Sequence, residues 1–429
     1  MDLDAARDFP HNPALLKLAL YCEGLRIDED ATAELHESRG ILRTRAGLGS
    51  GLELVLPGNL WTNAPVAEDF CAQSPFLLTF RKGRFQVRHE NGLATDVEIA
   101  PRPTWYDLRC STGKQMSRVG TLQGTYLGIY AANVCEFWTR KNREMCKFCS
   151  VGLNLGADDA SDKTQREVLE VVRMAKLQSG ITYVDFNTGH HEDEGYLDVL
   201  EPLVTAVKRE TGLLVGVQTP PHSDLERYRR LRELGVNRVS FCFELYDRER
   251  FDEICPGKSA TYGLDRYLET MDFCAALGKK VNMHEPWVTN GEIIAGLEDP
   301  QTTIAAIDRI TSVGAVPTVC VFRPLKGTAL AHLPPPKTED MVPVFRHLYE
   351  ACMRHNLPIG LAPNVHVSLV MLPEECAWLS PRRSSWSFRT KQWRLEVKKR
   401  VFHHLFDRKV RGISQDPAPV GSAVDGGEG

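Results

Sequence analysis

Six apolar, β-branched runs alternate with helix-like stretches through the middle of the chain. The runs cover residues 124–130, 181–186, 213–217, 238–243, 280–284 and 315–322. Helical periodicity fills the intervals at 164–179, 195–210, 223–234, 262–277 and 300–313. Strands that alternate with helices pair in parallel through right-handed crossovers. The sequence therefore predicts an α/β fold built on a partial (β/α)6 barrel.

Two helix starts in this region have the chemistry of N-caps. Thr164 stands just before one helical stretch, and Ser223 is followed three residues later by Glu226, as in a capping box. The candidate site residues described below follow successive strands. A barrel is favoured over a doubly wound sheet, because barrel active sites gather at the carboxyl ends of the strands.

The chain on either side of the alternation differs in texture. A helical stretch at 13–23 and the strand-like runs after it predict a small α+β domain over residues 1–115. We expect the barrel over residues 116–335 and a helical, basic extension over 336–411. The small, glycine-rich and proline-rich residues of 412–429 predict a disordered tail.

Residues 382–411 hold eleven Lys and Arg residues against Glu396 and Asp407, with aromatic residues between them. Such a segment either contacts an anionic surface, RNA or an acidic protein, or packs its aromatic side chains on the barrel and leaves the basic face in solvent. We favour the packing interpretation, because Trp386, Trp393 and Phe406 are too bulky to leave exposed.

Charge and apolar content narrow the class of protein. Lys and Arg total 52 against 56 Asp and Glu, a net charge of −4, which disfavours bulk nucleic-acid binding, so no DNA partner is expected. No apolar window is long enough to predict a secretory signal or a membrane span. The twelve cysteines are then expected to be reduced thiols, as in a cytoplasmic protein.

Three of these cysteines are clustered in a C-x10-C-x2-C pattern, at Cys135, Cys146 and Cys149. A [4Fe–4S] cube normally takes four cysteines, so three leave one iron open for another ligand. A zinc site would need a fourth protein ligand, which His190 or His191 could supply. The pattern favours the iron–sulfur cluster and leaves zinc as the alternative.

The Phe148-Cys149 ending, the strand before the cysteines and the βα units after them resemble the radical S-adenosylmethionine (SAM) superfamily. The resemblance implies a [4Fe–4S] cluster whose open iron binds SAM. It also implies reductive cleavage of SAM to a 5′-deoxyadenosyl radical that abstracts hydrogen from a small-molecule substrate, here unidentified. A reduced flavodoxin-type or ferredoxin-type electron donor would be the partner.

The same resemblance assigns SAM-binding roles to residues after successive strands. Asn187, Thr188 and Gly189 match the turn that holds the SAM ammonium group, and Glu244 matches the acidic residue that binds the ribose. The turn at 293–299, with Ile294 and Gly296, resembles the one beneath the adenine. Arg266 is placed as the partner of the SAM carboxylate.

A finer resemblance is to a biotin-synthase-like subgroup whose genes stand beside a nitrilase gene in bacteria. It rests on Tyr106-Asp107-Leu108, the lengthened cysteine gap, Pro256-Gly257-Lys258 and Arg266-Tyr267. The run at 322–330 also resembles biotin-synthase-like members. The substrate, product and oligomeric state do not follow from it.

Polar residues at strand ends are the candidates for substrate contact. They are Gln218 after the third run, His284 at the end of the fifth and Arg323 at the end of the sixth. The competing hypothesis is a non-catalytic scaffold that binds zinc, or an RNA-binding protein that uses the basic segment.

Overall fold

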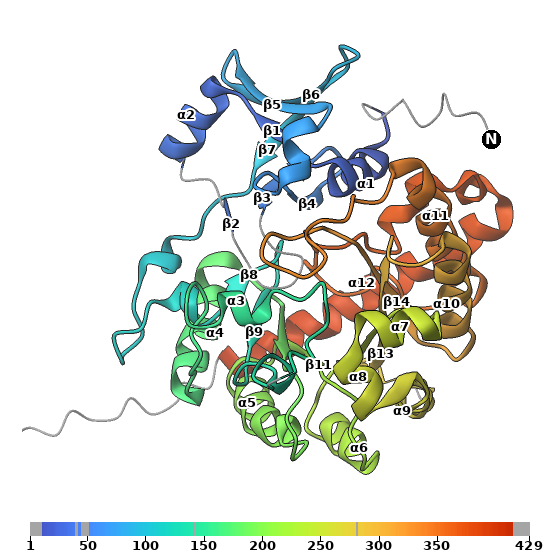
Figure 1. The fold of residues 1–429 in the computed structure, drawn as a ribbon. Coiled ribbons are helices and arrows are strands. Elements are labelled where there is room, and N and C mark those ends of the chain that lie inside the picture. The colour runs from blue at the N-terminus through green and yellow to red at the C-terminus, as the bar shows by residue number, and fades with distance from the viewer. Residues whose placement is uncertain (1–10, 39–41, 44–50, 141, 280–281, 415–429) are drawn as a thin grey trace, which may run out of the picture.

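The computed structural model describes residues 11–38, 42–43, 51–140, 142–279 and 282–414 (Figure 1). Its larger sheet has seven strands in the order β14-β13-β12-β11-β10-β9-β8. Every neighbouring pair from β9 to β14 is parallel, and β8 pairs antiparallel with β9. The predicted α/β fold with six parallel barrel strands is therefore confirmed.

The barrel elements follow one another in strict alternation for most of their length. The strands are β8 (Thr121–Leu122), β9 (Leu127–Tyr130), β10 (Tyr183–Asn187), β11 (Leu214–Gln218), β12 (Arg238–Glu244), β13 (Val288–Ala295) and β14 (Val316–Val321). The helices are α3 (Val151–Asn154), α4 (Gln165–Ser179), α5 (Tyr196–Thr211), α6 (Glu226–Glu233), α7 (Arg248–Ile254), α8 (Pro256–Thr261), α9 (Gly263–Leu277) and α10 (Pro300–Ser312).

A second sheet precedes the barrel, in the order β1-β5-β6-β7-β3-β2, and β4 pairs with β3. Its strands are β1 (Arg26–Ile27), β2 (Leu42–Arg43), β3 (Gly51–Leu56), β4 (Leu60–Ala64), β5 (Phe76–Arg81), β6 (Arg84–His89) and β7 (Ala94–Ile99). The helices α1 (Pro13–Glu23) and α2 (Glu29–Ser38) accompany it. We propose the domain boundary at 115/116, in the connection between this sheet and β8.

Of the two predicted helix N-caps, one is confirmed and the other is wrong. α4 begins after Thr164, whose hydroxyl accepts from the backbone N–H of Glu167 while the Glu167 carboxylate accepts from that of Thr164, so this N-cap is confirmed. The Ser223 cap is wrong, because α6 begins at Glu226 and the Ser223 hydroxyl donates to Glu194 instead.

The fifth barrel strand also differs from its prediction. It runs over Val288–Ala295 rather than 280–284, of which 280 and 281 lie outside the described residues. The Asn282 side chain accepts hydrogen bonds from the backbone N–H groups of His284 and Glu285, which bends the chain into a turn. Pro286 follows and has no N–H to give to a sheet.

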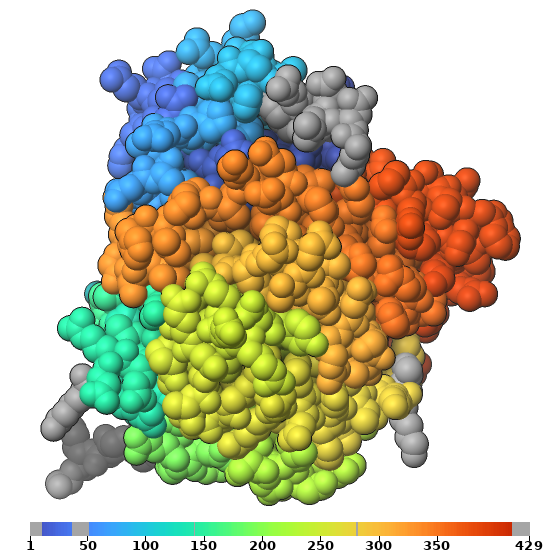
Figure 2. Space-filling view, turned by 45° about the vertical axis from the view of Figure 1, so that its right-hand side comes forward, coloured from blue at the N-terminus to red at the C-terminus, as the bar shows by residue number. Residues whose placement is uncertain are grey.

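The chain after β14 returns to the open side of the barrel. Residues 364–371 connect its two edges, because the N–H of Thr125 donates to the carbonyl of His366 at 3.0 Å and Met371 forms a β-bridge with Val319. The Tyr21 hydroxyl of α1 donates to the carbonyl of Ser368 at 2.6 Å. In Figure 2, orange chain from the region after β14 lies between the blue N-terminal region and the yellow-green barrel helices.

The C-terminal region is helical, with α11 (Thr338–Arg354) and α12 (Trp386–Ser414). α12 crosses the amino-terminal end of the barrel, where Lys409 pairs with Glu285 (Figure 1). Phe402 and Phe406 are 5% exposed, so part of the aromatic set packs as predicted. Trp386 and Trp393, however, are 84% and 67% exposed, so the expectation that they pack inward is wrong.

Short 3₁₀ turns complete the described chain: η2 (Asp69–Gln73), η3 (Thr104–Asp107), η4 (Met116–Arg118), η5 (Glu136–Trp138), η6 (Glu375–Leu379) and η7 (Pro381–Ser384). Within the described ranges, no helix has the length and apolar content that crossing a bilayer requires. Residues 415–429, which make up most of the predicted tail, lie outside the described residues, and α12 already includes 412–414.

Candidate functional site

A cavity of about 1080 Å³ occupies the lumen of the barrel. Side chains on a strand alternate between its two faces, so every second residue of the barrel strands faces this space. The lining includes Asp185, Asn187, Gln218, Arg238, Cys242, Glu244, Asn290, Glu292, Thr318 and Cys320. Polar side chains thus line the inside of the barrel, although the strands that carry them are otherwise apolar.

The three clustered cysteines lie at the carboxyl-terminal end of this cavity. Cys135, Cys146 and Cys149 all line it, in the loop between β9 and α3. Burial raises the pKa of Cys149 to about 12 and also raises the pKa of Cys135. Burial disfavours the thiolate form of these cysteines, so a bound cation that stabilises the thiolate would offset that cost.

The surroundings of Cys135 fit a bulky group held by the loop. The N–H of His190 donates to the Cys135 sulfur at 3.3 Å, and Gly189 packs so closely that an added Cβ would lie 2.4 Å from the Cβ of Cys135. The Tyr130 hydroxyl beside them is buried without a hydrogen-bond partner among the described residues. The loop is therefore shaped by the turn after β10, and an unpaired polar group lies beside Cys135.

Of the two histidines considered as a fourth zinc ligand, His190 is engaged by other groups, whereas Nε2 of His191 is buried without a hydrogen-bond partner among the described residues. The His190 ring is engaged on both sides, with Nδ1 2.5 Å from the Tyr262 hydroxyl and Nε2 3.2 Å from Arg140. In the part of the chain that the structure describes, no group of three or more His, Cys, Asp or Glu residues is arranged to hold one metal ion. A [4Fe–4S] cube takes one thiolate per iron, so its ligands need not converge on a single point.

The predicted SAM-binding turn after β10 opens into the same cavity. Asn187, Thr188 and Gly189 all line it. The N–H of Thr188 donates to the carbonyl of Gln218 at 3.0 Å, and the Asn187 amide donates to the Gln218 side chain. The turn is thus fixed to the end of β11 and lies beside Cys135.

Glu244 lies at the end of β12 and forms an ion pair with Lys258 of α8 at 2.6 Å. Its φ of 69° is in the left-handed region, which is unusual for a residue other than glycine, and the register with β13 shifts at this point. Burial raises the pKa of Glu244 and Lys258 opposes that shift. The carboxylate is therefore held by strained backbone at the cavity wall, with one cation beside it.

The remaining predicted SAM-binding residues do not all line the cavity. Ile294 lines the cavity, but it lies inside β13 rather than after the strand. Gly296 has a φ of 98° and packs against Pro336, where an added Cβ would meet the ring at 2.8 Å. Arg266 is not among the cavity-lining residues. Its guanidinium pairs with Glu194 and lies 5.1 Å from the Tyr262 ring centroid.

The three substrate candidates have different outcomes. Gln218 lies in the lumen and donates to Glu292. His284 precedes β13, so it lies at the end of the barrel opposite the cysteines, and its prediction as a strand-end residue is wrong. Arg323 lines the cavity, and its guanidinium donates to the Asn63 carbonyl at 2.7 Å and lies over the Tyr21 ring.

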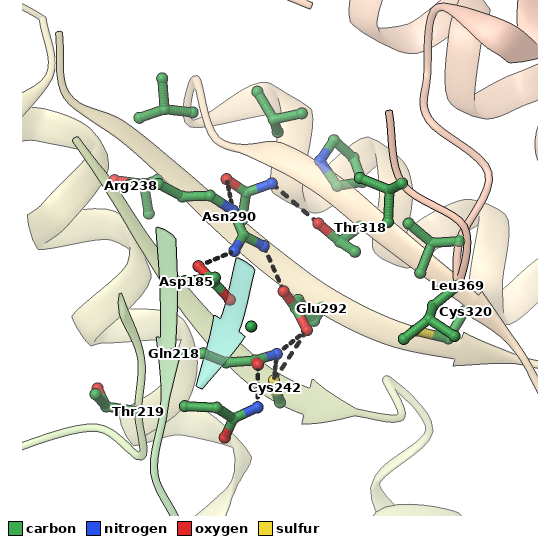
Figure 3. A pocket seen from close by; sticks show the side chains of 18 of the residues that line it. Asp185, Gln218, Thr219, Arg238, Cys242, Asn290, Glu292, Thr318, Cys320 and Leu369 are labelled. Carbon is green, nitrogen blue, oxygen red and sulfur yellow. Dashed lines mark hydrogen bonds and ion pairs between the residues drawn. The ribbon is translucent and has the colours of Figure 1, made fainter. Parts of the chain in front are cut away.

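Sequence analysis missed the most polar part of the lumen. Asp185, Arg238 and Glu292 come from three different strands and join in one network (Figure 3). It also missed Lys258 as a partner of Glu244. The available signal was the placement of charged residues at alternate positions of strands that are otherwise apolar.

Residues 139–299 match the radical SAM superfamily. The chain contains a radical SAM domain. The match includes Cys146 and Cys149 and begins four residues after Cys135. Members of this superfamily use a [4Fe–4S] cluster and SAM, and the match supports an enzyme.

A bacteriochlorophyllide c C-7(1)-hydroxylase of Chlorobaculum limnaeum is 29% identical over 147 residues, which are 34% of this chain and 35% of the relative. The chain thus matches about a third of the length of that relative. Among solved structures, methylornithine synthase (PylB) superposes with a TM-score of 0.42 at 17% identity, over 65% of this chain and 85% of that one. Coproporphyrinogen III oxidase (HemN) from Escherichia coli gives 0.34 at 14% identity, over 49% and 50%.

Proposed function

We propose that the protein is a radical SAM enzyme that acts on a small-molecule substrate in the barrel lumen. The observation that carries this proposal is the opening of three cysteine thiols into the same cavity as Asn187 and Glu244. When bound, a reduced [4Fe–4S] cluster supplies the electron that cleaves SAM to methionine and a 5′-deoxyadenosyl radical, which abstracts hydrogen from the substrate.

The residues of this chain would bind and orient the two cofactors. Cys135, Cys146 and Cys149 hold the cluster. Glu244 accepts hydrogen bonds from the SAM ribose, since a carboxylate suits two hydroxyl donors. Asn187, Thr188 and Gly189 bind the ammonium group.

The other SAM assignments lie at the end of β13 and near the start of α9. Ile294 and Gly296 contact the adenine from the end of β13. Arg266 reaches the SAM carboxylate only by exchanging its present partner Glu194 for it.

The substrate would bind in the part of the lumen between Glu244 and the amino-terminal ends of the barrel strands. Gln218 faces it from β11, and residues 364–371 cover the open side of the barrel. This cover keeps bulk water from the reacting groups, as a site for a reactive intermediate requires. His284 is not assigned a substrate contact, because it precedes β13 at the opposite end of the barrel, whereas Arg323 lines the cavity with its guanidinium bound to Asn63.

We further propose membership of the biotin-synthase-like subgroup found beside nitrilase genes, on the motifs given above. A reduced flavodoxin-type or ferredoxin-type protein would deliver the electron. A cytoplasmic location agrees with the twelve free cysteines. The barrel would extend over residues 116–335 and the C-terminal extension over 336–411.

The test is cluster assembly in anaerobically reconstituted protein. The wild type should be brown and contain iron and sulfide, and the Cys135/Cys146/Cys149→Ala triple variant should be colourless and free of iron. Cys320→Ala, which removes another cavity thiol, should keep the iron content of the wild type. A triple variant with wild-type iron, or a colourless wild type that binds zinc, would reject the proposal.

A further inference from the structure

Arg238 is the most prominent cation in the middle of the lumen, but it has no donor left for a ligand. Its Nε donates to Asn290 at 3.1 Å, Nη1 donates to Asp185 at 3.2 Å and to the Tyr183 hydroxyl at 3.5 Å, and Nη2 donates to Ser240 at 3.2 Å and to Glu292 at 2.5 Å. A guanidinium has five N–H donors, and all five are used. The lumen therefore does not offer Arg238 as an anion site.

Glu292 is equally committed. One of its oxygens accepts from Arg238 and from the Ser240 hydroxyl at 2.6 Å, and the other accepts from the Gln218 amide and from the Cys242 thiol at 3.1 Å. Four donors saturate this carboxylate. Glu292 is thus a structural acceptor that holds β11, β12 and β13 together inside the barrel.

Asp185 differs from both. Its Oδ1 accepts from Arg238 at 3.2 Å and from the Tyr183 hydroxyl, whereas its Oδ2 has no hydrogen bond with any described residue. Asp185 is buried in the protein and lines the cavity. Figure 3 shows it around the same space as Gln218 and Glu292, on the side of β10.

The charge balance around Asp185 points the same way. Asp185 and Glu292 together carry two negative charges against the one of Arg238. Lys258 is neutralised by Glu244. Around Asp185 the carboxylates therefore outnumber the cations, and Arg238 has no donor left, which favours a ligand that brings positive charge.

We propose that the substrate of this enzyme carries an amine, which binds in the barrel lumen as an ammonium group on Oδ2 of Asp185. This inference rests on the proposed function, under which a ligand bound at Asp185 is the substrate. The ammonium group would donate a charge-assisted hydrogen bond to an oxygen that has no partner among the described residues. A carboxylate or phosphate in the same place would meet the Asp185 carboxylate, and Arg238 beside it has no donor left.

The experiment uses three probes of one size with the full chain, before SAM is added. Binding of n-butylammonium, 1-butanol and butyrate is followed by ligand-detected NMR. Butylammonium should bind about tenfold or more tightly than the other two, as expected for one charge-assisted contact. Asp185→Asn should abolish this preference, and Asp265→Asn, which removes an exposed carboxylate paired with Arg248, should leave it unchanged.

Equal binding of the three probes to the wild type, or stronger binding of butyrate, would overturn the amine inference even if Asp185→Asn does not fold. Retention of the butylammonium preference in folded Asp185→Asn would overturn it as well. These failures are separate from failure of the proposed function, which shows as absence of 5′-deoxyadenosine from the reconstituted, reduced wild type with SAM.

Discussion

Gly189 packs directly against Cys135, so that a Cβ atom at Gly189 would lie 2.4 Å from the Cβ of Cys135 and 2.7 Å from the Tyr130 hydroxyl. The turn after β10 and the loop after β9 therefore fit together without room for one methyl group. This contact joins the proposed SAM-binding turn to the proposed cluster loop.

Gly189→Ala should displace Cys135 and lower the iron content of reconstituted protein. Real Cβ atoms do not approach to 2.4 Å, so the loop must move. Gly412→Ala is the control, because an added Cβ there meets nothing within 4 Å. Iron content in Gly189→Ala equal to that of the control would show that the loop yields at no cost to the cluster.

Glu244→Gln should retain the cluster and weaken SAM binding by about 1–3 kcal/mol, the value of a lost hydrogen bond to a charged group. Titration calorimetry with SAM on the reconstituted protein measures it. Glu226→Gln, on the exposed face of α6, should bind SAM as the wild type does. Unchanged affinity in Glu244→Gln would remove its assigned role at the ribose.

Truncation after Pro381 should lower the melting temperature, because it removes Phe402 and Phe406 from the barrel. Each large buried side chain contributes about 1.5–3 kcal/mol. Trp393→Ala should change the melting temperature little, since Trp393 is 67% exposed. A truncated protein that melts with the wild type would mean that α12 contributes nothing to stability.

The free energy of unfolding at low pH should depend on the carboxylate of Glu167. Burial opposes its charge, but hydrogen bonds from Thr112, the backbone N–H of Thr164 and Lys114 outweigh burial and lower its pKa to about 2. A lowered folded-state pKa contributes stability that is complete above about 4.5 and lost as pH falls towards 2.

The difference in unfolding free energy between wild type and Glu167→Gln should therefore be about 3 kcal/mol near neutral pH and shrink between pH 4.5 and 2. Denaturant unfolding at several pH values measures it, with the exposed Glu339→Gln as reference. A difference independent of pH would show that the hydrogen bonds do not require the ionised form.

The periodicity of the sequence was enough to predict the barrel, because apolar strands and amphipathic helices alternate with their ordinary spacing. The fifth strand was misplaced because the apolar residues of 280–284 imitate a strand, whereas the Asn282 turn and Pro286 prevent one there. Because the fifth strand was misplaced, His284 was predicted at the carboxyl end of the barrel strands, whereas it lies at the opposite end.

The placement of Cys135, Asn187 and Glu244 at one edge of the sheet could be predicted, because they follow or end strands and the chain order gives that edge. The Asp185–Arg238–Glu292 network was not, since its partners lie 53 and 54 residues apart and meet only through the strand register. The commitment of Arg323 to Asn63, 260 residues away, likewise needed the packing of the two sheets.

The most direct test of the account is formation of 5′-deoxyadenosine by the anaerobically reconstituted protein with dithionite and SAM. We expect 5′-deoxyadenosine and methionine to form in equal amounts with the wild type, and neither with the Cys135/Cys146/Cys149→Ala variant. A wild-type protein that holds a [4Fe–4S] cluster and binds SAM, yet forms no 5′-deoxyadenosine under reduction, would contradict the proposed function.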